Sequence, residues 1–366
     1  MIKKLRFAAA MIGSSLDGVD FAVYDWSIYY KRRKPKSIEA QQLFCTTIQL
    51  MEGHVAQIEE IRAAKTPLST NYERQFTIDF VRSLRNALDE YWIRGTDGLV
   101  FHGPTLRHEP KRSISLQLGD GQLLSNLLGT RVMNELRQAD LDAGGQGAPL
   151  MPILDAWCFN DYDGTLNLGG IANVSLTKNG EMPRGWDICG CNQLLNFGAG
   201  LLGAPFDKDG AWAGMGIAVD EVLVQLEQFE YLQKQPPKSL SNKQVEQYAI
   251  GLFKGTDIDP INLLASYVRH IVKQISAVLN EYALKNVLIT GGGAKNKFLI
   301  DSLRKDCPQV QIDVPEDSLI NYKECQLLSL MGLLNVLGAP NALASVTGAT
   351  HNTIGGKWYK PVVNES

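Results

Sequence analysis

The residues best suited to chemistry in this sequence lie between Asn167 and Asn192. Two apolar, strand-like runs flank the double glycine Gly169-Gly170, and a carboxylate, Asp187, follows the second run. Glycines between strands can bring backbone N–H groups against a phosphate, because a residue without a Cβ allows close approach and positive φ. A carboxylate close behind such a turn can act on the group that receives the phosphate. We therefore predict that this stretch forms the floor of a nucleotide-dependent active site.

Two further glycine-rich turns strengthen this prediction. Gly13–Gly18 lies between two strand-like runs, and Gly291–Gly293 follows the apolar run 286–290 and precedes a helix expected from residue 297. A strand, a glycine loop and a helix N-terminus together favour an anion. The spacing matches neither the P-loop nor the dinucleotide-binding motif. Three such turns spread over both halves of the chain indicate a nucleotide held between two domains, and phosphoryl transfer with Mg²⁺ and a carboxylate base.

The elements that position these turns follow from periodicity and length. A chain of 366 residues should fold as two domains with a ligand cleft between them. The expected order of strand, glycine turn, strand and helices in the first half is repeated in the second half. The basic run within residues 28–39 is expected to be a solvated loop or strand rim. The glycine-rich segment 137–150 is expected to be a fixed loop at the cleft rather than a mobile linker. The other expected strands are 7–12, 19–26, 98–101, 113–118 and 286–290, and the expected helices are 76–91, 122–128, 262–284 and 297–305.

Composition excludes several classes of protein. Lys+Arg 36 against Asp+Glu 39 gives a net charge of -3, which argues against nucleic acid as the principal partner. Six scattered cysteines without a disulfide or zinc spacing indicate reduced thiols in the cytoplasm. The apolar run at residues 7–12 is too short for a signal peptide, and no run is long enough to span a membrane. We therefore expect a cytoplasmic protein with neither a nucleic-acid nor a membrane partner.

Seven motifs, from about residue 10 to 350, resemble in order and spacing those of the anhydro-N-acetylmuramic acid kinases. They are Gly13–Gly18, His102-Gly103-x-Thr105, Gly144–Leu150, Asn167–Asn173, Phe206–Trp212, Gly291–Asn296 and Val346–Ala349. The resemblance implies an α/β fold of two duplicated actin/hexokinase-like (ribonuclease H-like) domains with an interdomain nucleotide cleft. The implied lobes are residues 1–160, with 336–366 packed on them, and residues 161–335. It also implies a cytoplasmic homodimer in peptidoglycan recycling. In the implied reaction, water opens the 1,6-anhydro ring of the amino sugar while O6 receives the γ-phosphoryl of ATP.

Site residues follow from the same resemblance, position by position. Asp187 matches the catalytic aspartate, which takes a proton from the attacking water; the alternative is a strand-end carboxylate that caps a turn. Asp17 is expected to order Mg²⁺ through water. His102, Arg137, Glu324 and Asn192 are expected to contact the sugar, although His102 can equally be a structural histidine. Asp207 and Asp209 can equally hold a loop. The residues implied in ATP binding are Gly13, Ser14, Ser15, Leu16, Asp17, Gly18, Gly169, Gly170, Asn173, Gly291, Gly292, Gly293 and Asn296.

This sequence departs from the family pattern next to Asp187. The family's Phe-Asp-Thr-Gly-Pro-Gly-Asn is here residues 186–192, so that Ile188 replaces a threonine, and Cys189 and Cys191 replace glycines. Any positive φ at those cysteines would cost about 1 kcal/mol or more. Pro104 replaces a glutamine, Ile12 a serine, and the usual Lys-Ser-Thr-Gly-Arg-Glu is residues 238–243. Three interpretations therefore stay open: an active kinase of the family, a non-catalytic or weakly active paralogue that binds nucleotide or sugar as a sensor or scaffold, and a kinase for a different amino sugar.

Overall fold

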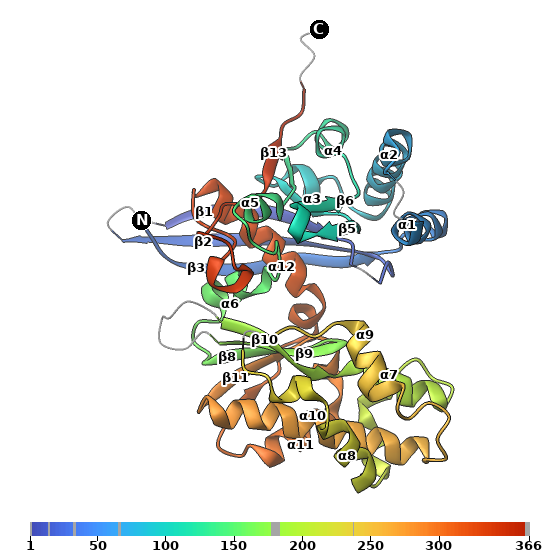
Figure 1. The fold of residues 1–366 in the computed structure, drawn as a ribbon. Helices are drawn as coiled ribbons and strands as arrows, with labels where there is room; N and C mark the ends of the chain where they lie inside the picture. Colours follow the sequence, from blue (N-terminus) through green and yellow to red (C-terminus); the bar gives the residue numbers. More distant parts are fainter. Residues whose placement is uncertain are drawn as a thin grey trace. The chain divides into compact units, whose positions relative to one another are not determined.

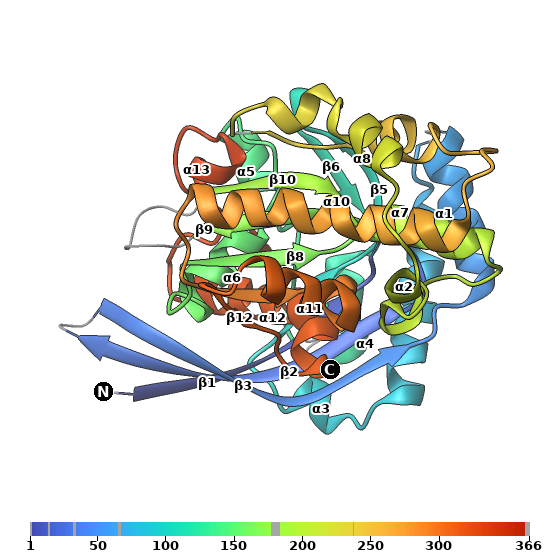
Figure 2. The same ribbon diagram turned by 90° about the horizontal axis from the view of Figure 1, so that it is seen from below.

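The computed structural model describes residues 2–13, 15–31, 34–64, 67–176, 184–236 and 238–362 (Figures 1 and 2). The chain divides into two compact units. Unit 1 comprises Met1–Cys158 and Tyr322–Ser366, and unit 2 comprises Phe159–Asn321. The chain re-enters unit 1 at Tyr322. The second lobe expected from the sequence ends at residue 335.

Unit 1 is built on a six-stranded sheet with the order β13-β7-β4-β1-β2-β3. The first three strands form an antiparallel meander, and β4 and β7 then add in parallel beyond β1. The run 28–39, expected to be a solvated loop or strand rim, forms the end of β2 and the start of β3 in its described residues, so the strand alternative holds. The bounds are β1 Ile2–Met11, β2 Val19–Lys31, β3 Lys34–Ile48, β4 Leu99–His102, β7 Val132–Asn134 and β13 Lys357–Tyr359.

Alternation along the strands gives this sheet two apolar faces. Ala8 and Ala10 of β1 share a core cluster with residues of α2 (Thr70–Ala87), and the rings of Phe80 and Phe101 lie 4.7 Å apart. The opposite face is covered by α12 (Asp317–Val336), which approaches closely at Gly332; a Cβ there would lie 2.6 Å from Val100 Cγ2. The remaining elements of unit 1 are α1 Glu52–Ala64, α3 Tyr91–Arg94, β5 Thr105–Glu109, β6 Ile114–Gln117, α4 Gly121–Leu128, α5 Gln138–Asp142, α6 Met151–Cys158 and α13 Ala344–Thr347.

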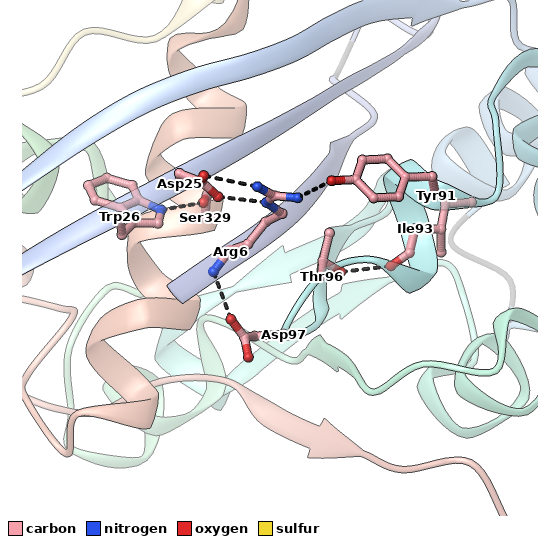
Figure 3. A network of polar contacts seen from close by, with 8 residues as sticks. All are labelled: Arg6, Asp25, Trp26, Tyr91, Ile93, Thr96, Asp97 and Ser329. Carbon is pink, nitrogen blue, oxygen red and sulfur yellow. Dashed lines mark hydrogen bonds and ion pairs between the residues drawn. The ribbon is translucent and has the colours of Figure 1, made fainter. Parts of the chain in front are cut away.

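Polar side-chain contacts join the unit 1 sheet to the helices that pack on it (Figure 3). The Arg6 guanidinium on β1 forms an ion pair with its cross-strand neighbour Asp25 at 2.6 Å and donates to the Tyr91 hydroxyl on α3 at 2.6 Å. On the other face, Trp26 Nε1 donates to Ser329 Oγ of α12 at 2.7 Å. Because the Trp26 ring is fully buried, this bond satisfies an indole N–H that burial would otherwise leave without a partner.

Unit 2 repeats the same sheet pattern with the order β10-β9-β8-β11-β12. Strands β8, β9 and β10 form an antiparallel meander, and β11 and β12 add in parallel beyond β8. Strand order and direction thus match those of β1, β2, β3, β4 and β7 in unit 1, which confirms the expected α/β fold with duplicated actin/hexokinase-like units. The bounds are β8 Gly164–Leu168, β9 Ile171–Leu176, β10 Arg184–Gly190, β11 Asn286–Thr290 and β12 Gln311–Asp313.

Helices cover one face of the unit 2 sheet. The long helix α10 (Pro260–Glu281) runs along the sheet in Figure 2, and its apolar stripe joins the core cluster that contains Leu166, Val174 and Ile188. Asp259 caps its first turn and Pro260 occupies the first helical position, so the helix begins two residues before the predicted one. The other helices are α7 Asn192–Leu201, α8 Asp220–Glu227, α9 Asn242–Val245 with a π-helical turn at Glu246–Ile250, and α11 Lys297–Asp306. Within the described residues, no helix is long and apolar enough to span a membrane.

Candidate active site

A row of polar side chains crosses the unit 2 sheet on the face away from its core. Asn167 on β8 pairs directly with Asn173 on β9, and Asn173 pairs with Asp187 on β10. Residues directly opposite each other in a sheet point to the same face. The neighbours of Asp187 along its strand, Trp186 and Ile188, are buried in the core cluster. Register therefore brings two sequence-predicted site residues, Asn173 and Asp187, side by side on the polar face.

The Asp187 carboxylate is held by hydrogen bonds from one nearby segment. Its Oδ2 accepts from the Leu240 backbone N–H at 2.8 Å and from Ser239 Oγ at 3.2 Å. Its own backbone carbonyl accepts from the Tyr231 hydroxyl at 2.7 Å. Hydrogen bonds of this kind would also be made by a carboxylate that caps a turn, the alternative role of Asp187. The Asp187 side chain nevertheless stays on the polar face and is half-buried.

Burial decides the protonation behaviour of this carboxylate. Desolvation raises the pKa of Asp187 above its ordinary value, and the hydrogen bonds from Leu240 and Ser239 oppose the rise. A raised pKa makes an aspartate carboxylate a stronger proton acceptor. The environment of Asp187 therefore suits a general base.

The three residues that depart from the family pattern at positions 188, 189 and 191 lie in the core of unit 2, not on the polar face. Ile188 is 3% exposed, and Cys189 and Cys191 are fully buried in the same cluster. Cys191 has φ −132°, and Cys189 is not among the described residues with positive φ. Neither cysteine therefore carries the backbone strain that the sequence analysis considers. The substitutions change packing beneath the site rather than the groups that face a ligand.

Two glycine turns meet beside the start of α7. The Gly169 and Gly170 carbonyls accept from the N–H groups of Asn192 at 3.0 Å and Cys191 at 2.8 Å. Asn192 Nδ2 donates to the Leu168 carbonyl at 3.0 Å, and a Cβ on Gly293 would lie 2.9 Å from Asn192 Oδ1. Asn192 therefore links the 169–170 turn to the 291–293 turn.

Close contact explains glycine at position 291. A Cβ there would lie 2.6 Å from Asn167 Oδ1 and 2.8 Å from the Leu168 backbone, and its φ is +83°. Gly169, Gly170, Gly292 and Gly293 do not have positive φ. For Gly169 and Gly292, where a Cβ would make only ordinary contacts, the expected benefit of glycine is space for another group. At Gly293 a Cβ would lie 2.7 Å from Leu168 Cβ, so close packing within the protein explains that glycine.

A cavity of about 690 Å³ opens beside the 291–293 turn within unit 2. Its size falls in the range of small-molecule sites. Phe206, Val314 and Ile320 supply apolar surface, while Gly292 and Gly293 supply bare backbone. The Asn296 side chain also lines the cavity, and its Oδ1 caps α11 by accepting from the Leu299 N–H at 3.0 Å.

The loop after Phe206 is held by an internal carboxylate. Asp207 is 6% exposed and accepts from the N–H groups of Trp212 at 3.0 Å and Ala213 at 2.9 Å. Asp209 forms an ion pair with Lys297 at 3.2 Å. Of the two roles left open for Asp207, the structure shows the loop-holding one.

In unit 1, the Gly13–Gly18 turn lies beside the end of β4. The Ile12 N–H donates to the His102 carbonyl at 3.0 Å, and Ser15 Oγ donates to Asp17 Oδ1 at 2.8 Å. Leu16 has φ +58°, whereas Gly18 is glycine because a Cβ would lie 2.7 Å from Thr47 Cγ2. Ser14 lies outside the described residues.

The fit of this turn to Mg²⁺ depends on its carboxylates. Asp17 is exposed, and Asp20 follows at the start of β2, where burial raises the pKa of its carboxyl. Mg²⁺ commonly keeps several waters and binds through one or two carboxylates plus substrate phosphates. No group of three or more His, Cys, Asp or Glu side chains among the described residues is arranged to hold a metal. The donors present thus fit a hydrated Mg²⁺ and not an all-protein cage.

His102, Arg137 and Glu324 come together in unit 1 from three different elements. Arg137 Nε donates to His102 Nε2 at 3.3 Å, and Arg137 Nη1 donates to the Gly147 carbonyl at 2.7 Å. Burial and the adjacent guanidinium lower the pKa of His102 to about 3, so the ring is neutral and carries its proton on Nδ1. Desolvation by the surrounding protein atoms raises the pKa of Glu324, although part of its side chain is exposed to solvent. The positive charge of Arg137 opposes that rise. This arrangement offers a cation and a carboxylate to one polar ligand.

The loop 144–147 is fixed by a buried carboxylate. Asp140 on α5 is fully buried and accepts from the Gly147 N–H at 2.7 Å and from Thr347 Oγ1 at 2.7 Å. Because Gly147 in turn accepts from Arg137, this carboxylate holds the loop that orients the guanidinium. Hydrogen bonds thus hold residues 144–147 in place, whereas the first part of the expected loop is the helix α5. The position of this loop at a cleft stays a prediction.

Sequence reasoning missed several residues of these two sites. Asn167 lies in the polar row, and Asp20 lies next to the 13–18 turn. Strand alternation could have placed Asn167, since it occupies the same face of β8 as Thr165. Ser239 gives no local signal, because its partner Asp187 is 52 residues away, and the contact of Asp140 with Thr347 spans 207 residues.

Duplicated α/β units with glycine turns at strand ends and a carboxylate on a polar sheet face define a phosphotransferase of the actin/hexokinase-like class. The particular family follows from sequence. The family model described as Anhydro-N-acetylmuramic acid kinase matches residues 5–361, and the chain belongs to this family.

Relatives in several bacteria agree with this assignment. The chain is similar to the anhydro-N-acetylmuramic acid kinases of Thiobacillus denitrificans (29% identity, covering 94% of both chains) and Bordetella pertussis (32% identity, covering 76% of this chain and 78% of the relative). Among solved structures it is similar to (R)-2-hydroxyglutaryl-CoA dehydratase component A of Acidaminococcus fermentans, with 15% identity, 89% and 96% coverage and a TM-score of 0.45. That score is below 0.5, and the family assignment rests on the sequence relatives.

Proposed function

We propose that this chain converts 1,6-anhydro-N-acetylmuramic acid, water and ATP into N-acetylmuramic acid 6-phosphate and ADP. The observation that carries the proposal is the placement of Asp187 in the polar row beside Asn173, half-buried and with Oδ2 anchored. Family membership supports the substrate class. The proposed setting is peptidoglycan recycling in the cytoplasm, with the chain acting as a homodimer.

Asp187 is the general base of the proposed reaction. It takes one proton from a water molecule while the water oxygen bonds to the anomeric carbon. The bond from that carbon to O6 breaks, and O6 attacks the γ-phosphorus of ATP, so that ADP leaves. The raised pKa of Asp187 supports this role, because proton transfer is most effective when the base is poised closer to the working pH.

The glycine turns bind the nucleotide in this proposal. Gly291–Gly293 and Asn296 border the unit 2 cavity, whose apolar lining suits a nucleoside. Gly169, Gly170 and Asn173 are proposed to approach the phosphates, as is the Gly13–Gly18 turn of unit 1. Asp17 would hold Mg²⁺ through water, and the ion would neutralise phosphate charge.

The sugar is proposed to contact Arg137, Glu324 and His102. Arg137 offers donors that suit a carboxylate, which muramic acid carries on its lactyl group. Asn192 is also proposed to contact the sugar; its Nδ2 donates to the Leu168 carbonyl, and its Oδ1 accepts from Cys191 Sγ at 3.8 Å. Ile188, Cys189 and Cys191 lie in the core and not on the polar face, which supports the active kinase over a non-catalytic paralogue.

The test is turnover with ATP, Mg²⁺ and the anhydro sugar, followed by detection of ADP and the 6-phosphate. We expect Asp187→Asn to reduce turnover by about 10²–10⁴-fold, because the amide cannot accept the proton and base catalysis of this kind contributes an effect of that size. Thermal unfolding checks that the variant folds. A folded Asp187→Asn protein that keeps its activity would refute the proposal, and wild-type protein that phosphorylates only free amino sugars would identify a different sugar kinase.

A further inference from the structure

Residues of the gripping segment, Tyr231–Leu240, form four hydrogen bonds with Asp187. The Asp187 N–H donates to the Lys238 carbonyl at 3.3 Å, and its carbonyl accepts from the Tyr231 hydroxyl. The carboxylate accepts from Ser239 Oγ and the Leu240 N–H. Backbone and side chain of one residue are thus fixed by a stretch that lies more than 40 residues away in the sequence.

Both side-chain hydrogen bonds reach the same oxygen. Oδ2 accepts from Ser239 and Leu240, whereas Oδ1 accepts no hydrogen bond from any described residue. Two donors on one oxygen fix the rotation of the carboxylate about its Cβ–Cγ bond. They also use up the lone pairs of Oδ2, so that Oδ1 is the oxygen left to accept a proton.

We propose that Ser239 is a positioning residue that, together with the Leu240 N–H, anchors Asp187 Oδ2 and leaves Oδ1 as the proton-accepting atom. The inference rests on the proposed function of Asp187 as the general base. It also explains why leucine is tolerated at position 240, where the family usually has threonine. The donor at that position is the backbone N–H, which every residue except proline supplies.

The gripping segment is itself held in place. Leu240 is 4% exposed and Tyr231 is 3% exposed, and both belong to the unit 2 core cluster. The Lys238 ammonium lies over the Tyr231 ring, 4.9 Å from its centroid. Directly after the segment, Ser241 and Gln244 form a reciprocal capping box at the start of α9. Ser239 therefore donates from a supported backbone.

The titratable groups near the Asp187 carboxylate decide whether a change in the pH dependence of kcat/KM can be assigned to Asp187. Tyr231 and Lys238 lie on the gripping segment, Cys189 lies on β10, and the β9 neighbour is the neutral Asn173. Burial raises the pKa of Tyr231 and of Cys189, so both stay neutral between pH 4 and 8. Burial lowers the pKa of the Lys238 ammonium from its usual value.

The experiment compares the pH dependence of kcat/KM for Ser239→Ala, Ser239→Thr and Ser241→Ala with wild-type enzyme. Removal of the Ser239 donor should raise the pKa of Asp187 and move the acid limb up by about one pH unit, since a hydrogen bond to a charged group has an effect of that order. Ser239→Thr keeps a hydroxyl and should restore the wild-type limb. Ser241→Ala disturbs the same segment through the capping box without touching Asp187, and its limb should not move.

The outcomes separate this inference from the proposed function. An acid limb in Ser239→Ala at the wild-type position, or an equal shift in Ser241→Ala, overturns the positioning role. If Asp187→Asn is inactive while Ser239→Ala is normal at every pH, only the positioning role fails. If Asp187→Asn retains activity, the base assignment fails first. The KM for ATP should be unchanged in Ser239→Ala, because Ser239 acts through the base.

Discussion

At the scale of single residues, two neighbouring glycines of the 291–293 turn differ in what a side chain would meet. Gly291 has φ +83°, and a Cβ there would overlap Asn167 and the Leu168 backbone. Gly292 lacks positive φ, and a Cβ there would lie 3.5 Å from Asn192 Nδ2, an ordinary contact. The first glycine is required by the fold, whereas the second is free to serve a ligand.

Gly291→Ala should therefore lower the free energy of unfolding by about 2 kcal/mol or more, because strain and overlap with backbone add up. Gly292→Ala should change it by less than about 1 kcal/mol. Denaturant unfolding of both variants measures the difference. Equal stability of the two would show that the turn relaxes around an added methyl group.

At the scale of elements, the helix α10 carries a buried histidine in the unit 2 core. His270 is fully buried, and neither ring nitrogen has a hydrogen-bond partner among the described residues. Burial lowers the pKa of His270 to about 4, below the ordinary value of 6.5. The folded protein therefore keeps the ring neutral at pH values where the unfolded chain is protonated.

The direction of the pH effect follows from proton binding. Below pH 6.5, His270 binds a proton in the unfolded chain but not in the folded protein. The free energy of unfolding therefore falls as the pH decreases from 6.5 toward 4. The loss should reach about 3 kcal/mol, at roughly 1.4 kcal/mol per pH unit. His270→Leu should reduce the acid slope of stability measured by denaturant unfolding, and the exposed control His351→Ala should not. An unchanged slope in His270→Leu would mean that the core accommodates the charge.

At the scale of the whole molecule, the chain passes between the two units at 158–159 and again at 321–322. A buried ion pair within unit 1 lies near both positions in the sequence, where Lys323 Nζ approaches Asp155 Oδ1 at 3.0 Å. Their side chains are 6% and 2% exposed. This pair joins α6 to α12, the two helices that carry the chain across.

Asp155→Ala should lower the free energy of unfolding by about 3–5 kcal/mol, because the Lys323 ammonium stays buried without its carboxylate. The matched control is Asp306→Ala, which breaks the exposed pair with Arg269 and should cost less than about 1 kcal/mol. The midpoint of chemical unfolding checks both. Similar losses in the two variants would show that solvent reaches the Asp155–Lys323 pair.

The sequence by itself determined the elements with strong local patterns and the chemistry they carry. Strand 286–290 and helix 297–305 were predictable because apolar periodicity and capping residues are local signals. The glycine turns and Asp187 were identifiable by motif. The basic run within residues 28–39 was expected as a solvated loop or strand rim, and its described part forms the paired ends of β2 and β3, with Lys36, Ser37 and Glu39 exposed.

Only the tertiary structure decided which side chains meet. Register placed Asn167, Asn173 and Asp187 in one row, and packing put Ile188 and the two cysteines beneath it. The grip of Ser239 on Asp187 joins residues 52 apart, which no local pattern records. Periodicity tells which face of an element is apolar, but the partners of a polar side chain depend on where distant segments pack.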